Sequence, residues 1–161
     1  MDEIKASVQI NTPIEKVWNI VSDLDGESRL WNNITKVRNL SQEGNTVKRE
    51  LTMGKDDRCL QTVTVYPKEK VHAEFTKGII NGTKIITLIP SGSGTTLEIY
   101  WNIKFTGAAG FMKGMLLKNF EQQTEAVLET IKRELEFGVQ PSNVQMESRT
   151  HWADLIDSDK K

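Results

Sequence analysis

The feature that most constrains the fold is a long amphipathic segment near the end of the chain, residues 109–137. Apolar side chains recur at helical spacing along one face, at Leu116, Phe120, Val127, Ile131 and Leu135, and charged side chains occupy the opposite face. At about 1.5 Å per residue, this segment predicts a single helix roughly 40 Å long. Residues 33–106 contain short strand-like runs instead, so one long helix has to cover a whole sheet.

These runs have the spacing of an antiparallel meander, with turn-forming residues between them at intervals of about 8–12 residues. The six runs are 34–40, 46–53, 58–66, 71–77, 83–89 and 95–105. An alternating run at residues 4–10 adds a seventh strand. It is followed by a helix start, in which Thr12 is placed to cap the helix, and by a second short helix or turn at residues 23–31. This order predicts an α+β fold with a curved seven-stranded antiparallel sheet.

Composition excludes several classes of function. The chain has 161 residues, enough for one domain, and a net charge of −1, so no global basic field attracts nucleic acid. No apolar run approaches the roughly 18 residues of a membrane span, and the charged start differs from a secretory signal. The single cysteine, Cys59, excludes an internal disulfide and a thiolate metal cluster. We therefore expect a cytoplasmic protein with no integral membrane segment, no metal and no cofactor.

The pattern of buried and exposed residues ends after Gly138. We expect residues 1–138 to form the domain and residues 139–161 to form a tail that is flexible or docked on the surface. Trp152, Leu155 and Ile156 have helical spacing in this tail and could dock on the body or on a second copy. A homodimer is therefore one possible assembly.

Three stretches of the sequence together have a recognisable order and spacing. They are residues 10–18, which read INTPIEKVW, the segment from Ser22-Asp23-Leu24 to Trp31, and Phe105-Thr106-Gly107 followed by the long helix. In this arrangement the chain resembles the START-like SRPBCC superfamily, which includes lipid-transfer, birch-pollen-allergen-like and polyketide cyclase/dehydrase-like proteins. Over residues 2–137 the resemblance implies the helix-grip fold, a curved sheet wrapped around a long C-terminal helix, with two short helices after the first strand.

The resemblance also implies a ligand cavity between the concave face of the sheet and the long helix. Its expected guest is a small hydrophobic or amphipathic molecule, such as a lipid, a polyketide or an isoprenoid-like compound. The residues expected to line it are Trp31, Arg49, Leu51, Phe75, Ile99, Trp101, Ile103, Met112, Leu116, Phe120 and Thr124.

Arg49 is the most unusual of these residues, because it shares a strand face with apolar neighbours. A buried guanidinium has to pair with a carboxylate, extend to the rim, or meet an anionic ligand group. Trp101 either packs in the core or lines the cavity, and its indole N–H needs an acceptor. Thr124 either contacts a ligand or bonds to its own backbone four residues back. Residues 107–111, together with Gly114, form either a flexible gate or a tight turn.

These observations favour a binding or carrier protein for a small hydrophobic molecule. One alternative is a polyketide cyclase- or dehydratase-like enzyme. It needs converging polar groups, and Arg49 with a tyrosine or a carboxylate is the only such assembly that the sequence suggests. A second alternative is a protein-interaction adaptor that uses the C-terminal tail.

Overall fold

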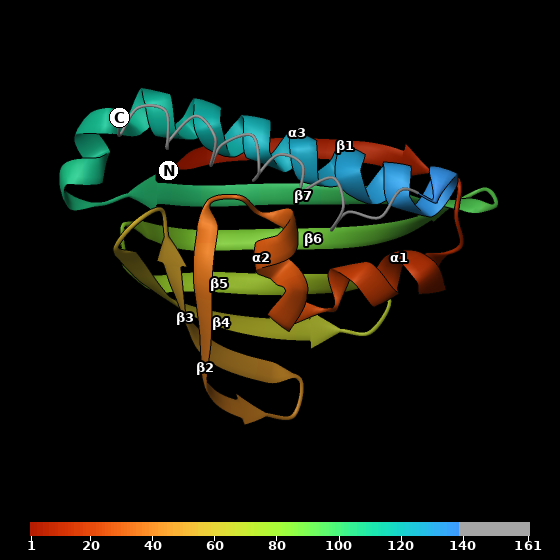
Figure 1. The fold of residues 1–161 in the computed structure, drawn as a ribbon, viewed down its shortest axis with the longest axis horizontal. Helices are drawn as coiled ribbons and strands as arrows, with labels where there is room; N and C mark the ends of the chain where they lie inside the picture. Colours follow the sequence, from red (N-terminus) through yellow and green to blue (C-terminus); the bar gives the residue numbers. More distant parts are fainter. Residues whose placement is uncertain (139–161) are drawn as a thin grey trace, which may run out of the picture.

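Seven antiparallel strands form one curved sheet in the order β1-β7-β6-β5-β4-β3-β2 (Figure 1). The computed structural model describes residues 1–138 of the chain. The strands are β1 (Asp2–Ile10), β2 (Ile34–Glu43), β3 (Thr46–Met53), β4 (Asp57–Tyr66), β5 (Lys70–Gly78), β6 (Ile80–Ser91) and β7 (Gly94–Phe105). The helices are α1 (Ile14–Val21), the 3-10 helix η1 (Leu24–Gly26), α2 (Glu27–Leu30), the 3-10 helix η2 (Gly107–Met112) and α3 (Lys113–Phe137). The predicted helix-grip fold is confirmed.

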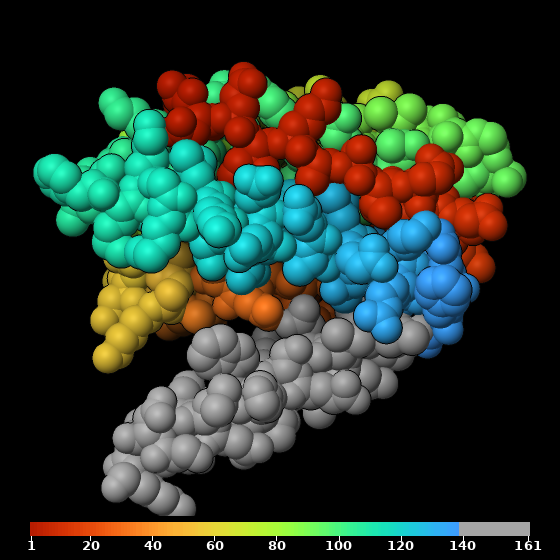
Figure 2. Space-filling model, turned by 90° about the horizontal axis from the view of Figure 1, so that it is seen from above, coloured from red at the N-terminus to blue at the C-terminus, as the bar shows by residue number. Residues whose placement is uncertain are grey.

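The helices divide the concave face between them. The long helix α3 packs mainly along the edge strand β1, and Figure 2 shows the two side by side. The short helices α1 and α2 cross in front of the middle strands of the sheet (Figure 1). α3 buries the apolar stripe that its sequence predicts, with Phe120, Val127, Leu128 and Ile131 on its inner side. A single helix therefore does not cover the whole sheet, and the α1–α2 segment closes the remainder.

Alternation along the strands decides which side chains face inward. In β7 the buried apolar side chains are Leu97, Ile99, Trp101, Ile103 and Phe105, as the sequence pattern predicts. In β6, which has a mixed pattern, Ile80, Lys84 and Leu88 are buried. A lysine thus occupies an inward position in the middle of the sheet.

Two glycines allow the sheet to bend. Gly82 has a φ of 129°, and a Cβ atom there would lie 2.1 Å from the carbonyl oxygen of Asn102 on β7. Gly78 has a φ of 132°, and its Cβ would lie 2.3 Å from the carbonyl oxygen of Arg58 on β4. Glycine inside a strand is typical of such close backbone approaches and of sharp bends.

The helix start after β1 differs from the expectation. α1 begins after Pro13 without a side-chain cap, so the prediction that Thr12 caps it is wrong. Thr12 is buried instead, and its carbonyl oxygen accepts a hydrogen bond of 2.9 Å from Thr95 Oγ1 on β7. Packing against the sheet therefore decides the position of Thr12.

Some expectations fall outside the part of the chain that the structure describes. The tail at residues 139–161, with Trp152, Leu155 and Ile156, lies there, and the boundary at residue 138 and the homodimer stay predictions. Among residues 1–138, no helix has both the length and the apolar composition needed to cross a membrane.

Candidate functional site

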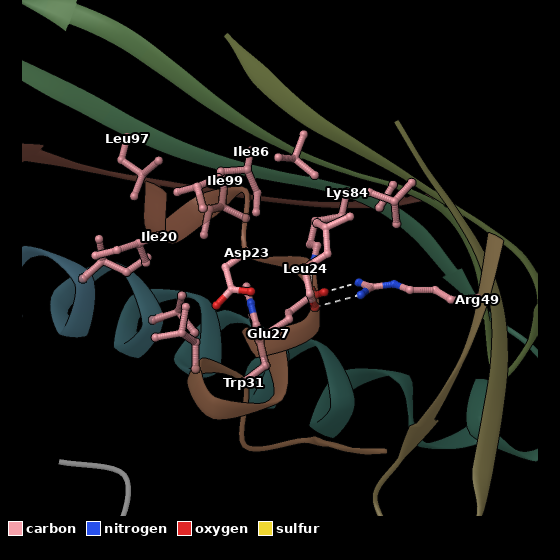
Figure 3. A pocket seen from close by; sticks show the side chains of 17 residues that line it. Ile20, Asp23, Leu24, Glu27, Trp31, Arg49, Lys84, Ile86, Leu97 and Ile99 are labelled. Carbon is pink, nitrogen blue, oxygen red and sulfur yellow. Dashed lines mark hydrogen bonds and ion pairs between the residues drawn. The ribbon is translucent and has the colours of Figure 1, made fainter. Parts of the chain in front are cut away.

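A cavity lies between the α1–α2 segment, the middle of the sheet and the second half of α3 (Figure 3). Most of its wall is apolar, and the sheet contributes Val63, Val71, Ala73, Ile86, Leu97 and Ile99. α3 contributes Val127 and Ile131, and the α1–α2 segment contributes Ile20, Val21, Leu24, Leu30 and Trp31. The charged side chains at the wall are Asp23, Glu27, Arg49 and Lys84.

The vacant part of this cavity is small. The space open to the centres of water molecules is about 30 Å³. Open space of this size holds on the order of a few water molecules. The sequence predicted a hollow between the sheet and α3 that accommodates a ligand. In this conformation, side chains occupy most of that space, so a guest longer than a few atoms requires the walls to move.

An aromatic cluster fills the region beneath the first half of α3. Trp101 lies at its centre, with ring centroids 5.6 Å from Trp31, 5.9 Å from Phe75 and 5.3 Å from Phe120. Phe105 extends the cluster, with its ring centroid 5.4 Å from that of Phe120. These rings occupy the volume in which the sequence predicted the ligand. The vacant space is therefore shifted toward α1 and α2.

The polar atoms of this cluster bond to one another. The indole Nε1 of Trp101 donates a hydrogen bond of 3.0 Å to Thr124 Oγ1. Thr124 Oγ1 in turn donates a bond of 2.7 Å to the carbonyl oxygen of Phe120, four residues back on α3. Of the two alternatives for Thr124, the structure shows the backbone bond. Its hydroxyl group connects α3 to β7 inside the core.

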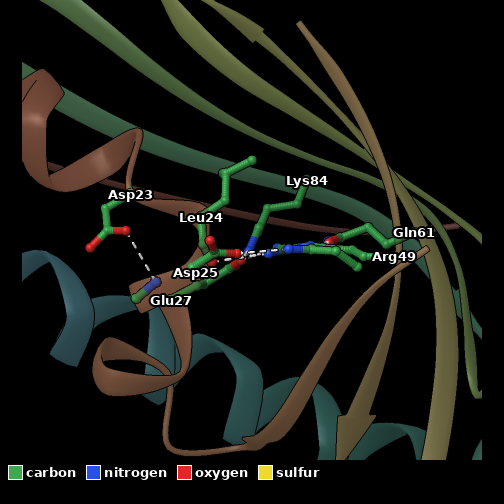
Figure 4. A network of polar contacts seen from close by, with 9 residues as sticks. Asp23, Leu24, Asp25, Glu27, Arg49, Gln61 and Lys84 are labelled. Atoms are coloured by element: carbon green, nitrogen blue, oxygen red, sulfur yellow. Dashed lines mark hydrogen bonds and ion pairs between the residues drawn. The ribbon is translucent and has the colours of Figure 1, made fainter. Parts of the chain in front are cut away.

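Beside the cavity, Arg49 belongs to a buried polar network (Figure 4). Its side chain is only 1% exposed, and its guanidinium forms an ion pair with Glu27 Oε2. Nε donates to Gln61 Oε1 at 2.6 Å, and Nη1 donates to the carbonyl oxygen of Leu24 at 3.0 Å. Of the three alternatives for Arg49, pairing with a carboxylate is the one observed. The carboxylate comes from α2, so the network also attaches the α1–α2 segment to the sheet.

Lys84 reaches the same carboxylate from β6. Its Nζ donates to Glu27 Oε1 at 2.7 Å, and only 3% of its side chain is exposed. The ammonium also lies 4.6 Å from the ring centroid of Trp31 and 5.1 Å from that of Trp101. Aromatic faces attract cations at these distances. One carboxylate therefore lies between two cations, from β3 and β6.

For both Lys84 and Glu27, burial and ion pairing shift the pKa in opposite directions. Burial raises the pKa of Glu27, but the charges of Lys84 and Arg49 outweigh it and hold the pKa at about 2. Burial lowers the pKa of Lys84, the nearby Arg49 lowers it further, and Glu27 opposes both effects. Glu27 is therefore ionised throughout the neutral range, and Lys84 is the member of the network whose pKa moves toward neutrality.

We expect the network to make stability depend on pH in acid. The pKa of Glu27 is about 2 in the folded protein, against an ordinary value of 4.5. The unfolded chain thus binds more protons at this site between pH 4.5 and 2, and stability falls as pH falls through that window. The Glu27 contribution is complete above about pH 5 and amounts to about 3 kcal/mol. Urea unfolding at pH 7 and pH 3 measures the loss, and the Glu27 carboxyl carbon resonance identifies the group. A Glu27 midpoint near 4.5 in the folded protein would contradict the prediction.

The predicted cavity residues separate into three groups. Trp31, Arg49 and Ile99 line the cavity. A second group is buried but lies outside its lining, namely Leu51, Phe75, Trp101, Ile103, Phe120 and Thr124. Leu116 is half-buried, and Met112 is 49% exposed, so Met112 is not a cavity residue in this structure. The reason is that α3 begins at Lys113, later than predicted, and the preceding η2 and first helical turns expose Phe111, Met112 and Met115.

Sequence reasoning did not identify Glu27, Lys84 or Gln61. Lys84 carries the same signal as Arg49, because it alternates with Gly82, Ile86 and Leu88 on an apolar face. Gln61 likewise alternates with Cys59 and Val63. Glu27 had no comparable signal, because it lies in a four-residue helix that has no periodicity to compare it with.

Comparison with known proteins identifies the class to which this fold and cavity belong. A sequence model of a family described as polyketide cyclase / dehydrase and lipid transport matches residues 1–136. The chain belongs to this family, and the SRPBCC-like resemblance is confirmed. A search of curated protein sequences found no match to this chain.

Solved structures show the same fold at low sequence identity. The protein TTHA0849 of Thermus thermophilus has a TM-score of 0.70 and 18% identity, over 83% of this chain and 97% of that one. The Zhui aromatase/cyclase of Streptomyces sp. R1128 has a TM-score of 0.66 and 14% identity, over 86% and 98%. A START superfamily protein of Mycobacterium smegmatis has a TM-score of 0.60 and 16% identity, over 80% and 98%. Because the sequence identities are this low, these structures show a shared fold and no more.

Proposed function

We propose that this protein binds a small amphipathic molecule in the cavity beneath the α1–α2 segment, as a binding or carrier protein. The observation that supports this proposal is an apolar cavity wall in which the charged groups of Arg49, Glu27 and Lys84 lie together. Small-molecule sites are usually apolar pockets in which a few polar groups orient the ligand. The Arg49–Glu27–Lys84 network supplies such groups, and side chains such as Val71, Ile86 and Leu97 supply the apolar surface.

The small vacant volume limits how a ligand enters. Open space for a few waters admits a head group, so an apolar tail has to displace side chains or the α1–α2 segment. α2 has four residues and η1 has three, and Arg49 holds both through Leu24 and Glu27. We place the moving part in this segment, because η1 and α2 bury two side chains of their own, Glu27 and Leu30, against five on α3.

The family match, and the fold shared with an aromatase/cyclase, favour an enzymatic function as the alternative. The network argues against Glu27 as a general base, because a carboxyl group with a pKa of about 2 accepts a proton poorly at neutral pH. Arg49 pairs with Gln61, Leu24 and Glu27, and its guanidinium does not give up a proton at neutral pH, so it is not an acid–base group. An enzymatic alternative would therefore depend on Lys84. The adaptor alternative concerns the tail and remains a prediction.

A filled-cavity variant tests the binding proposal. Ala73 is 1% exposed and lines the cavity on β5, so Ala73→Val places two methyl groups into the vacant space. We expect calorimetry with 1-octanol to detect binding by the unsubstituted chain and at least a tenfold weaker affinity in Ala73→Val. Ala126→Val, at an exposed position on α3, is the matched control and should bind as the unsubstituted chain does.

Native mass spectrometry of the purified full chain provides a second measurement, and a bound compound lost on denaturation is the expected result. The proposal fails if no compound is found and the unsubstituted chain binds neither 1-octanol nor the corresponding carboxylate, octanoate. It also fails if Ala73→Val, folded by circular dichroism, binds 1-octanol as tightly as the control.

A further inference from the structure

We propose that the cavity selects guests that carry a carboxylate, and that this carboxylate lies against Arg49 and Lys84 beside Glu27. The inference rests on the binding function proposed above and specifies the chemical class of the ligand. Three features of the network support it: its charge, its hydrogen-bond donors and the size of the space next to it.

The first feature is an uncompensated positive charge. Arg49 and Lys84 are 1% and 3% exposed in their side chains, and Glu27 is the one carboxylate that pairs with either within the described residues. Two cations and one anion leave a net charge of +1 in the interior. A buried charge without a counter-ion is costly, and a second anion would neutralise it. Burial is the main cause that lowers the pKa of Lys84, and the neighbouring charge of Arg49 adds to it.

The other acidic groups nearby do not supply the missing charge. Asp23 lines the mouth of the cavity but is exposed, and its Oδ1 accepts from the backbone N–H of Gly26 at 3.3 Å. Figure 4 shows its carboxylate turned away from Arg49 and Lys84. Asp25 is also exposed and accepts from Asn39 Nδ2 at 2.9 Å. Both carboxylates therefore have other partners at the surface.

The second feature is a surplus of hydrogen-bond donors. An arginine has five N–H donors and a lysine has three. Within the described residues, Arg49 uses three of its donors, on Gln61, Leu24 and Glu27, and Lys84 uses one, on Glu27. The amide Nε2 of Gln61 is buried with no acceptor in this part of the chain. Each oxygen of Glu27 already accepts one of these bonds. The network thus has spare donors, and an acceptor-only group such as a carboxylate complements them.

The third feature is the vacant space itself. Arg49 and Lys84 both line the cavity, whose open volume of about 30 Å³ holds on the order of a few waters and so admits a group as small as a carboxylate. Ile86, Leu97 and Ile99 continue the wall beyond Lys84 (Figure 3). A molecule with a carboxylate at one end and a short aliphatic chain at the other matches this wall, which is charged at Arg49 and Lys84 and apolar beyond them.

A matched pair of ligands tests the inference, namely octanoate and 1-octanol, which differ in the head group. We expect calorimetry at pH 7 to show that the unsubstituted full chain binds octanoate at least ten times more tightly than 1-octanol. Lys84→Met removes the excess charge and keeps most of the side-chain volume, so the preference should disappear while 1-octanol still binds. Lys104→Met, at an exposed position on β7, is the control and should keep the preference.

The outcomes separate this inference from the proposed function. Equal or tighter binding of 1-octanol by the unsubstituted chain overturns the carboxylate preference but leaves the binding function in place. An unchanged preference in folded Lys84→Met also overturns it. Failure of both ligands to bind the unsubstituted chain overturns the binding function and, with it, this inference. If Lys84→Met does not fold, the comparison on the unsubstituted chain alone decides.

Discussion

Glu27→Gln should lower the free energy of unfolding by about 3–5 kcal/mol at pH 7, as expected when one partner of a buried ion pair is removed. The substitution preserves the shape of the side chain but leaves Arg49 and Lys84 facing each other without an anion. It also weakens the attachment of α2 to the sheet, because both cations hold α2 through this carboxylate. Urea unfolding followed by circular dichroism measures the change.

A pH series shows whether charge is the cause. In Glu27→Gln the stability should rise from pH 7 toward pH 10, because Lys84 then has no carboxylate to keep it protonated in the fold. The unfolded chain retains the ordinary lysine pKa of 10.5 and binds more protons in that range. Glu125→Gln, at an exposed position on α3, is the matched control and should change stability by less than about 0.5 kcal/mol. A loss of similar size in both variants would contradict this account.

Trp101→Ala should destabilise the fold by about 3–5 kcal/mol, the usual cost of truncating a buried tryptophan. Trp101 is 2% exposed, and its ring contacts Trp31, Phe75 and Phe120, so its removal leaves a large vacancy at the centre of the aromatic cluster. The vacancy would lie in the region where the sequence predicted a ligand. We therefore expect indole to bind this variant and to raise its melting temperature, which scanning calorimetry measures.

Trp101→Phe separates packing from hydrogen bonding. It keeps an aromatic ring among its neighbours but loses the bond from Nε1 to Thr124 Oγ1. Because Thr124 still donates to the carbonyl oxygen of Phe120, we expect a smaller loss, of about 1–2 kcal/mol. Indole should raise the melting temperature of Trp101→Ala and leave that of Trp101→Phe unchanged. Equal losses in the two variants would show that the ring contacts are not the main source of stability here.

The buried network has a physical consequence for function. A buried network of two cations and one carboxylate stabilises a core poorly. Replacing such a network with apolar side chains of similar volume often leaves the free energy of unfolding unchanged or raises it. Strongly perturbed ionisable groups beside a cavity are common at functional sites. The location of Arg49, Glu27 and Lys84 beside the vacant space is what connects them with ligand binding in our proposals.

Much of the fold could be predicted from the sequence, because local patterns determine it. The stripe at Phe120, Val127 and Ile131 predicts a long amphipathic helix, and the alternation at Leu97, Ile99 and Ile103 predicts a strand with one buried face. Turn residues at regular spacing predict the antiparallel meander between them. The inward position of Arg49 also followed from alternation alone, and the structure agrees with it.

The site depended on contacts between distant residues. Glu27 lies 22 positions from Arg49 and 57 positions from Lys84 along the chain, and no local pattern connects these residues. Side-chain volume decided where vacant space remains, because Trp101, Phe75 and Phe120 fill one half of the interior and leave the α1–α2 side partly open. Periodicity thus determined which side chains face inward. Only the tertiary structure decided which of them meet, because burial forces each charged group to find its partner across the sheet and the short helices.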